Sequence, residues 1–137
     1  NILIDQHLSA KISDFGMSTV KHIDQNGETL LGPVGSPFYM APEVLLDKPY
    51  DTKADVYSFS IVIWETLAHA DPYAGEFESY EEMVEGITMD EMRPNIPNWF
   101  PVGVIALLKQ CWATEPSERP SFSQILQQSW FDHILVD

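Results

Sequence analysis

Two oxygen-bearing side chains near the start of the sequence could bind a divalent metal ion. Asn1 precedes the strand-like run Ile2-Leu3-Ile4, and Asp14 follows a second such run over residues 10–13. The polar stretch between the two runs is typical of a short β-hairpin with a longer loop. A hairpin would bring the Asn1 amide oxygen close to the Asp14 carboxylate, and hard oxygen ligands of this kind suit a magnesium ion that also holds phosphates.

Asp14 also opens a segment that has a second motif at its far end. In Asp14-Phe15-Gly16 the aspartate supplies charge, the phenylalanine an apolar anchor, and the glycine a backbone free to adopt positive φ. The stretch Ser36-Pro37-Phe38-Tyr39-Met40-Ala41-Pro42-Glu43 follows later in the chain. Bounded by these two motifs, residues 14–43 resemble the activation segment of protein kinases.

The resemblance to protein kinases extends along the chain. Residues 55–60, Asp-Val-Tyr-Ser-Phe-Ser, resemble the start of the kinase central helix, and Cys111-Trp112 with Arg119-Pro120 resemble the end of the C-terminal lobe. Tyr39 to Glu43, with a hydroxyl at Ser36, are more similar to serine/threonine kinases of the tyrosine-kinase-like group than to tyrosine kinases. Two residues depart from the family pattern: Ser60 replaces a glycine, and Met17 stands where leucine is common.

The resemblance implies ATP and Mg²⁺ as cofactors and a protein substrate. Asp14 would chelate the magnesium that bridges the ATP phosphates, and Asn1 would be the catalytic-loop ligand of the second metal. The alternative for Asn1 is an ordinary amide at a strand edge. The residues implied in the activation segment and substrate docking are Phe15, Gly16, Ser36, Tyr39, Ala41, Pro42 and Glu43, where Ser36 would touch the catalytic aspartate and Tyr39 would serve mainly in packing.

The same resemblance implies structural roles for Glu43, Asp55 and Arg119. Glu43 and Arg119 are expected to form a buried ion pair, because either charge alone in an apolar lobe is strongly destabilising. Asp55 would accept backbone N–H bonds from the catalytic loop, and a plain N-terminal helix cap is its alternative.

Ser18, Thr19 and Thr29 are possible phosphorylation sites, because a phosphate can order such a segment by pairing with arginine.

Several parts of a complete kinase cannot be assigned. No G-x-G-x-x-G occurs, no strand lysine paired with a helix glutamate can be assigned, and the catalytic-loop aspartate would precede Asn1. We therefore expect residues 1–137 to be a partial kinase domain without the N-terminal lobe, part of an enzyme that transfers the ATP γ-phosphoryl group to serine or threonine, and inactive in isolation. Two alternatives stay open: a pseudokinase-type protein-binding module, and a fragment that does not fold stably alone.

The elements expected to position these residues make a mainly α (α+β) fold. After a long loop over residues 14–34, the sequence predicts a short helix at 42–46 and a longer one from about 53 to 68. The longer helix carries apolar groups around its whole circumference, so we expect it at the centre of a helical bundle. Further helices are predicted at about 78–87, 104–112 and 121–130.

Composition supports a folded chain and argues against nucleic acid binding, an intramolecular disulfide and membrane insertion. With 137 residues and 45% hydrophobic side chains, the chain can bury a core, and its net charge of −14 argues against nucleic acid. One cysteine, Cys111, excludes an intramolecular disulfide and favours a reducing, cytoplasmic location. No apolar run is long enough to predict a membrane-spanning helix. The spacing of the four histidines, His7, His22, His69 and His133, does not match that of metal ligands. The sequence leaves the oligomeric state open.

No basic residue lies between Lys53 and Arg93, whereas acidic residues accumulate there. This acidic face would attract basic substrates, or would simply be a hydrated helix surface. Its members are Asp71, Glu76, Glu78, Glu81, Glu82, Glu85, Asp90 and Glu91.

Overall fold

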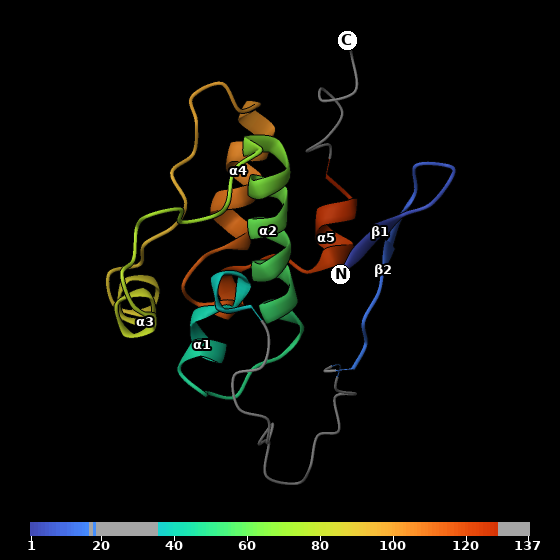
Figure 1. Ribbon diagram of the computed structural model, residues 1–137. Helices are drawn as coiled ribbons and strands as arrows, with labels where there is room; N and C mark the ends of the chain where they lie inside the picture. The colour runs from blue at the N-terminus through green and yellow to red at the C-terminus, as the bar shows by residue number, and fades with distance from the viewer. Residues whose placement is uncertain (17, 19–35, 129–137) are drawn as a thin grey trace, which may run out of the picture.

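The computed structural model describes residues 1–16, 18 and 36–128. Within these residues helices predominate, and the strands form one two-stranded antiparallel sheet, in agreement with the predicted fold class (Figure 1). The elements are β1 (Ile2–Ile4), β2 (Ala10–Ile12), the 3-10 helix η1 (Pro37–Tyr39), α1 (Pro42–Leu45), α2 (Thr52–Ala68), α3 (Tyr80–Thr88), α4 (Val102–Cys111), the 3-10 helix η2 (Pro116–Glu118) and α5 (Phe122–Leu126).

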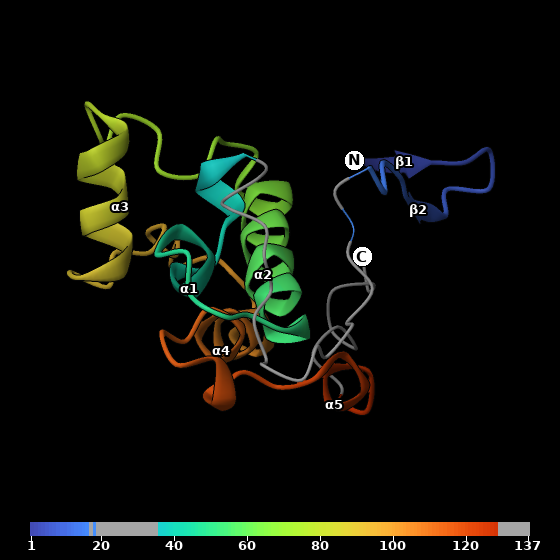
Figure 2. The ribbon, with the colours of Figure 1, turned by 90° about the horizontal axis from the view of Figure 1, so that it is seen from below.

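The predicted hairpin is formed by β1 and β2, with Ile2 opposite Ile12 and Ile4 opposite Ala10. Its turn is closed by Asp5, whose Oδ1 accepts the backbone N–H groups of His7 and Ser9 at 2.8 and 2.9 Å. Figures 1 and 2 show the hairpin standing apart from the helical body, and its apolar side chains are exposed. Local hydrogen bonds rather than core packing therefore hold this hairpin together.

Helix α2 is the centre of the helical body, as its apolar circumference predicts. Asp51 caps its N-terminus, because Oδ1 accepts the Lys53 backbone N–H at 2.8 Å. Tyr57 and Ile61 are fully buried, and α2 packs chiefly against α4 through a cluster that includes Val104. Figures 1 and 2 show α1 and α4 flanking α2.

Helix α4 is Val102–Cys111 rather than 104–112, and helices α3 and α5 differ from their predicted bounds where capping residues intervene. The prediction of 78–87 becomes Tyr80–Thr88, because the Ser79 hydroxyl accepts the Glu82 N–H at 3.1 Å and Glu82 accepts the Glu78 N–H. Helix α5 begins after Ser121, which forms a capping box with Gln124. It ends at Leu126, and residues 129 and 130 of the predicted helix lie outside the described residues.

The one cysteine is buried in the core. Cys111 is a free thiol at the end of α4, and burial raises its pKa to about 12. A thiol of this kind stays protonated and unreactive at neutral pH. Among the described residues, no helix is long and apolar enough to cross a membrane.

At Gly86 the side chains of Phe77 and Met92 lie close against the backbone of α3. A Cβ at this position would lie 2.7 Å from Phe77 Cε1 and 2.9 Å from Met92 Sδ. Glycine in a helix interior normally weakens the helix relative to alanine, so its presence here has a packing reason. It lets the segments on either side of α3 lie against the helix.

We predict that Gly86→Ala destabilises the fold. Alanine gains about 1 kcal/mol of helix propensity, but overpacking against Phe77 and Met92 costs roughly 1–3 kcal/mol, and we expect the melting temperature measured by circular dichroism to fall. Glu85→Ala, an exposed change on the same helix, is the control and should melt close to the unaltered chain. A higher melting temperature for Gly86→Ala would show that the space at this position is available.

Candidate functional site

The hairpin pairs the backbone of the first candidate metal ligand, Asn1, with the residue that precedes the second. The Ser13 backbone N–H donates to the Asn1 carbonyl at 2.9 Å, and the Ser13 hydroxyl donates to the same oxygen at 3.1 Å. Asn1 therefore pairs with the residue directly before Asp14, at the open end of the hairpin. The approach of the Asn1 amide oxygen to the Asp14 carboxylate, which the sequence predicts, stays a prediction.

Asp14 lies where the chain leaves the hairpin. It is exposed, its φ of 60° is in the left-handed region, and its Oδ1 accepts the Gly16 N–H at 3.3 Å. Among the described residues, no three His, Cys, Asp or Glu side chains gather to hold a metal. The Asn1 amide and the Asp14 carboxylate fit the sparse protein ligand set of Mg²⁺, which usually completes its octahedron with water and phosphate oxygens.

The rest of the segment's first half is described only in part. Phe15 is exposed, and so is Ser18. Thr19, Thr29 and Met17 lie outside the described residues.

The far end of segment 14–43 is attached to α2. Ser36 is exposed and precedes η1. Tyr39 donates its hydroxyl hydrogen to Glu65 Oε1 at 2.9 Å, and its carbonyl accepts the Ser58 hydroxyl at 2.7 Å. Desolvation, together with the hydrogen bond to Glu65, raises the pKa of Tyr39 to about 12. Tyr39 thus has a specific polar contact in addition to the packing expected of it.

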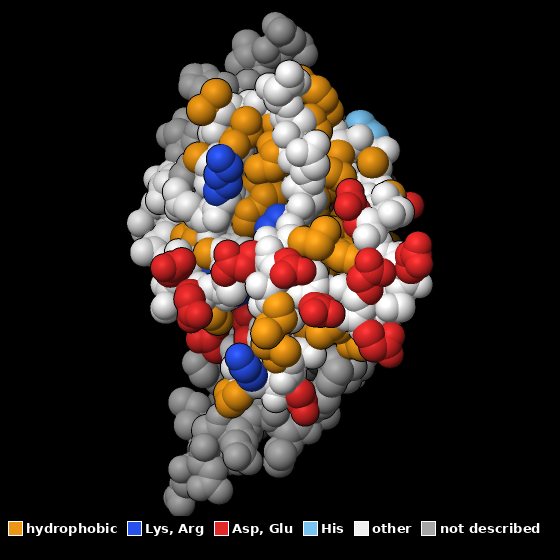
Figure 3. All heavy atoms as spheres, turned by 90° about the vertical axis from the view of Figure 1, so that its left-hand side faces the viewer, with side chains coloured by type: hydrophobic (Ala, Val, Ile, Leu, Met, Phe, Trp, Pro, Cys, Tyr) orange, Lys and Arg blue, Asp and Glu red, His pale blue; other side chains and the backbone are white. Residues whose placement is uncertain are grey.

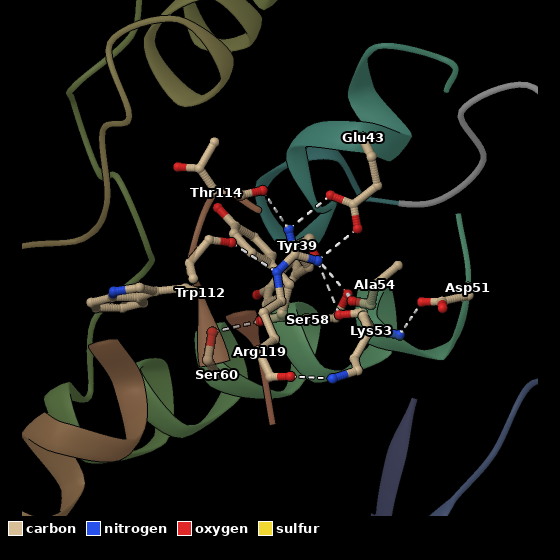
Figure 4. A network of polar contacts seen from close by, with 12 residues as sticks. Tyr39, Glu43, Asp51, Lys53, Ala54, Ser58, Ser60, Trp112, Thr114 and Arg119 are labelled. Carbon is tan, nitrogen blue, oxygen red and sulfur yellow. Dashed lines mark hydrogen bonds and ion pairs between the residues drawn. The ribbon is translucent and has the colours of Figure 1, made fainter. Parts of the chain in front are cut away.

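Beyond Tyr39 the chain enters the core. Ala41, Pro42 and Glu43 are all buried, with Pro42 at the first position of α1, where its missing N–H is not needed. Glu43 forms two hydrogen bonds with Arg119, from Nη1 to Oε1 at 2.6 Å and from Nη2 to Oε2 at 2.8 Å. The structure therefore contains the buried, bidentate ion pair expected of these two residues (Figure 4).

Arg119 connects several segments at once. Beyond Glu43, it donates to the carbonyls of Ala113, Lys53 and Thr114 at 2.8, 3.0 and 3.1 Å. All five guanidinium N–H groups therefore have an acceptor, although the side chain is only 1% exposed. The guanidinium also lies 5.2 Å from the centre of the Tyr57 ring. The start of α1, the start of α2 and the loop after α4 are joined through this one side chain.

Sequence reasoning missed a second structural arginine. Arg93 donates to the carbonyls of Ile87, Met92 and Trp112 at 2.7–3.0 Å, and it too lies 5.2 Å from the Tyr57 ring centre. It joins the C-terminal end of α3 to the end of α4. The available signal was a lone cation at the end of a long acidic stretch, directly before a proline.

Comparison with known proteins agrees with this arrangement. A model of the protein tyrosine and serine/threonine kinase family matches residues 1–128. The chain belongs to the protein kinase family.

Three proteins of Dictyostelium discoideum are similar to this kinase chain. It is 46% identical over its whole length to dual specificity protein kinase shkB, 42% identical over 93% of its length to probable serine/threonine-protein kinase drkC, and 38% identical over its whole length to dual specificity protein kinase shkC. It spans 21%, 17% and 26% of these three proteins, respectively. The similarity therefore covers a limited part of each relative.

Asp55 of this kinase chain does not cap α2, because Asp51 holds that position. Asp55 is exposed, yet partial desolvation at the start of the helix raises its pKa. Among the described residues its carboxylate accepts no hydrogen bond. The cap alternative is therefore excluded, and the expected bonds from a catalytic loop stay a prediction.

We predict that Asp55→Asn leaves the fold as stable as before, or slightly more stable, at neutral pH. A folded-state pKa above the unfolded value means that the native state holds the proton more tightly. The associated stability is present below the unfolded pKa and is lost as pH rises through the folded pKa. Denaturant unfolding of Asp55→Asn at pH 7 and pH 3 measures this, and its advantage should shrink at pH 3. Asp51→Ala, one turn earlier, should instead cost about 1 kcal/mol through loss of the cap.

The acidic face predicted from the sequence is exposed on the kinase chain. Figure 3 shows Asp and Glu side chains forming a band across one face of the molecule, and every acidic residue of this set is solvent-exposed. Arg93, which ends the stretch, is occupied by backbone carbonyls. Attraction of basic substrates to this face remains a hypothesis.

Proposed function

We propose that the full-length protein containing this chain transfers the γ-phosphoryl group of ATP to serine or threonine hydroxyls of a protein substrate. The observation that supports this most directly is the hairpin, whose register pairs Asn1 with the residue before Asp14. The family match supports the same reaction class. Two of the three relatives are named dual specificity kinases, so tyrosine is a second acceptor to be tested.

Each end of segment 14–43 has a part in this proposal. At the first end, the Asp14 carboxylate and the Asn1 amide would hold Mg²⁺, which neutralises charge on the phosphates during transfer. At the far end, the ion pair between Glu43 and Arg119 and the bond from Tyr39 to Glu65 fix the segment on the helical body. A fixed segment supports positioning of a substrate, because an aligned acceptor hydroxyl avoids much of the entropic cost of reaction.

The residues of this chain do not supply the whole reaction. A glycine-rich phosphate cover, a strand lysine and a base aspartate are needed for transfer and cannot be assigned here. We therefore expect the isolated chain to transfer no phosphate at a useful rate. A normal turnover by residues 1–137 with Mg-ATP would contradict this expectation.

The experiment that tests the proposal is transfer of labelled phosphate from Mg-ATP by the full-length protein, followed by analysis of the phosphorylated amino acids. Phosphoserine or phosphothreonine is the expected product, and phosphotyrosine beside them would indicate dual specificity. A protein that binds a partner but transfers no phosphate would support the pseudokinase alternative. Sequence before Asn1 discriminates as well, because a strand lysine and an H-R-D aspartate favour the enzyme.

A further inference from the structure

Tyr39 stands at the boundary between exposed and buried chain. Ser36 and Phe38 are exposed, whereas Met40 and Ala41 are buried at 8% and 1%. Tyr39 itself is half-buried, with its hydroxyl on Glu65 of α2. Tyr39 therefore joins the exposed residues of η1 to the buried start of α1.

Two side-chain hydrogen bonds attach this point to α2, one through the Tyr39 hydroxyl and one through its carbonyl to Ser58. Figure 4 shows Tyr39 and Ser58 close together beside the Arg119 network. The two residues of the hydroxyl bond are 26 positions apart in the sequence, so this bond joins η1 to a distant turn of α2. The hydroxyl bond requires a donor hydrogen on Tyr39, because the Glu65 carboxylate can only accept.

The charges that act on the Tyr39 hydroxyl are negative. Glu65 accepts its hydrogen bond, and Asp71 also raises the pKa of Tyr39 through its charge. The nearby arginine is already occupied, because every N–H group of Arg119 has an acceptor. An anion at the Tyr39 oxygen would therefore face carboxylates without a free guanidinium from Arg119 to pair with it.

We propose that Tyr39 is a phosphorylation site, and that a phosphate on it detaches Pro37–Tyr39 from α2. The γ-phosphoryl group of ATP would pass to the phenolic oxygen. The bond from the γ-phosphorus to the ADP oxygen breaks, a bond from that phosphorus to the Tyr39 oxygen forms, the phenolic proton goes to a base or to water, and ADP leaves. The product has no hydrogen to donate to Glu65 and carries a charge of about −1.5 to −2 at pH 7.

Detachment follows from both changes together. The lost hydrogen bond removes one of the two attachments to α2, and repulsion between the phosphate and the Glu65 carboxylate pulls against the other, the Ser58 bond to the Tyr39 carbonyl. Because Pro37–Tyr39 leads directly into buried Ala41 and α1, release would disturb the end of segment 14–43 without requiring α2 to unfold. Phosphorylation at this site would therefore act as an off-switch for positioning of the segment.

The detachment goes beyond the proposed function and does not depend on it, because a second kinase can supply the phosphate, whereas its effect as an off-switch rests on that function. The full-length protein is treated with an active tyrosine kinase and Mg-ATP, and the phosphorylated residues are mapped by mass spectrometry. Hydrogen exchange of the Tyr39 and Met40 amides, which donate to the Ser36 and Pro37 carbonyls, then reports on η1. We expect the phosphorylated form to exchange there at least about tenfold faster.

Three variants make the result specific. Tyr39→Phe cannot accept phosphate, and its η1 amides should exchange at the same rate with and without the added kinase. Glu65→Gln keeps an oxygen acceptor but removes the repelling charge, so phosphorylation should accelerate exchange less in this variant. Tyr80→Phe removes an exposed tyrosine on α3 and should leave the effect at η1 unchanged.

The proposal is overturned if the tyrosine kinase phosphorylates Tyr80 but not Tyr39, or if phosphate on Tyr39 leaves exchange at η1 unchanged. It is also overturned if phosphorylation accelerates exchange equally in Glu65→Gln. Failure of the full-length protein to phosphorylate any substrate would count against the proposed function alone, since the added kinase does not rely on that activity.

Discussion

Replacing Arg119 with alanine is expected to lower the free energy of unfolding by about 3–5 kcal/mol. The substitution leaves the Glu43 carboxylate without its partner in a site where Glu43 is 7% exposed. It also removes donors from the carbonyls of Ala113, Lys53 and Thr114. An unpaired buried charge is strongly unfavourable, and the part-buried carbonyls left without donors add to the loss.

Urea unfolding followed by tryptophan fluorescence measures this loss. Glu43→Ala and the double variant complete a double-mutant cycle, which isolates the coupling between the two side chains. The matched control is Lys11→Ala, because Lys11 and Asp5 form an exposed ion pair at 3.6 Å, and its removal should leave the unfolding midpoint in place. A loss below about 1 kcal/mol for Arg119→Ala would mean that solvent reaches Glu43 and replaces the arginine.

Asp14→Asn is expected to reduce phosphoryl transfer by the full-length protein at least about 1000-fold. The reason is electrostatic, because the proposed metal ligand loses its negative charge while the side chain keeps nearly the same shape. Asparagine also tolerates the positive φ of 60° that Asp14 adopts, so the backbone need not change. The fold should be unaffected, since Asp14 is exposed.

Initial rates with labelled ATP, taken across a range of Mg²⁺ concentrations, measure the effect of Asp14→Asn. Asp47→Asn is the control, because it makes the same chemical change at an exposed position with a similar positive φ of 51°, and it should retain full activity. Circular dichroism of both variants establishes that they are folded. Activity of Asp14→Asn within tenfold of the unaltered protein would remove Asp14 from the proposed metal site.

Local features of the fold were predictable because their causes are local in the sequence. The hairpin follows from two short strand-like runs separated by a polar stretch, and α2 follows from apolar side chains around the whole circumference of a helix. The two motifs that bound segment 14–43 are likewise contiguous. Helix ends were less well predicted, because a single capping residue such as Ser79 moves the boundary.

Contacts between distant positions were predictable only where the family resemblance supplied them. The pair Glu43 and Arg119, 76 residues apart, came from that resemblance, and no periodicity in the sequence points to it. Arg93 and the bond from Tyr39 to Glu65 were not predicted, because their partners are backbone carbonyls or a side chain on another element.

The sequence by itself determined which segments form the hairpin and the α-helices, and it contained the two motifs that bound segment 14–43, since hydrophobic period and turn chemistry act over a few residues. Only the tertiary structure decided which charges are buried, which are occupied and which remain free. Burial and hydrogen-bond saturation are properties of a packed neighbourhood. Arg119 with all its donors satisfied and Tyr39 held against a carboxylate therefore become visible only once α1, α2 and the loop after α4 are packed together.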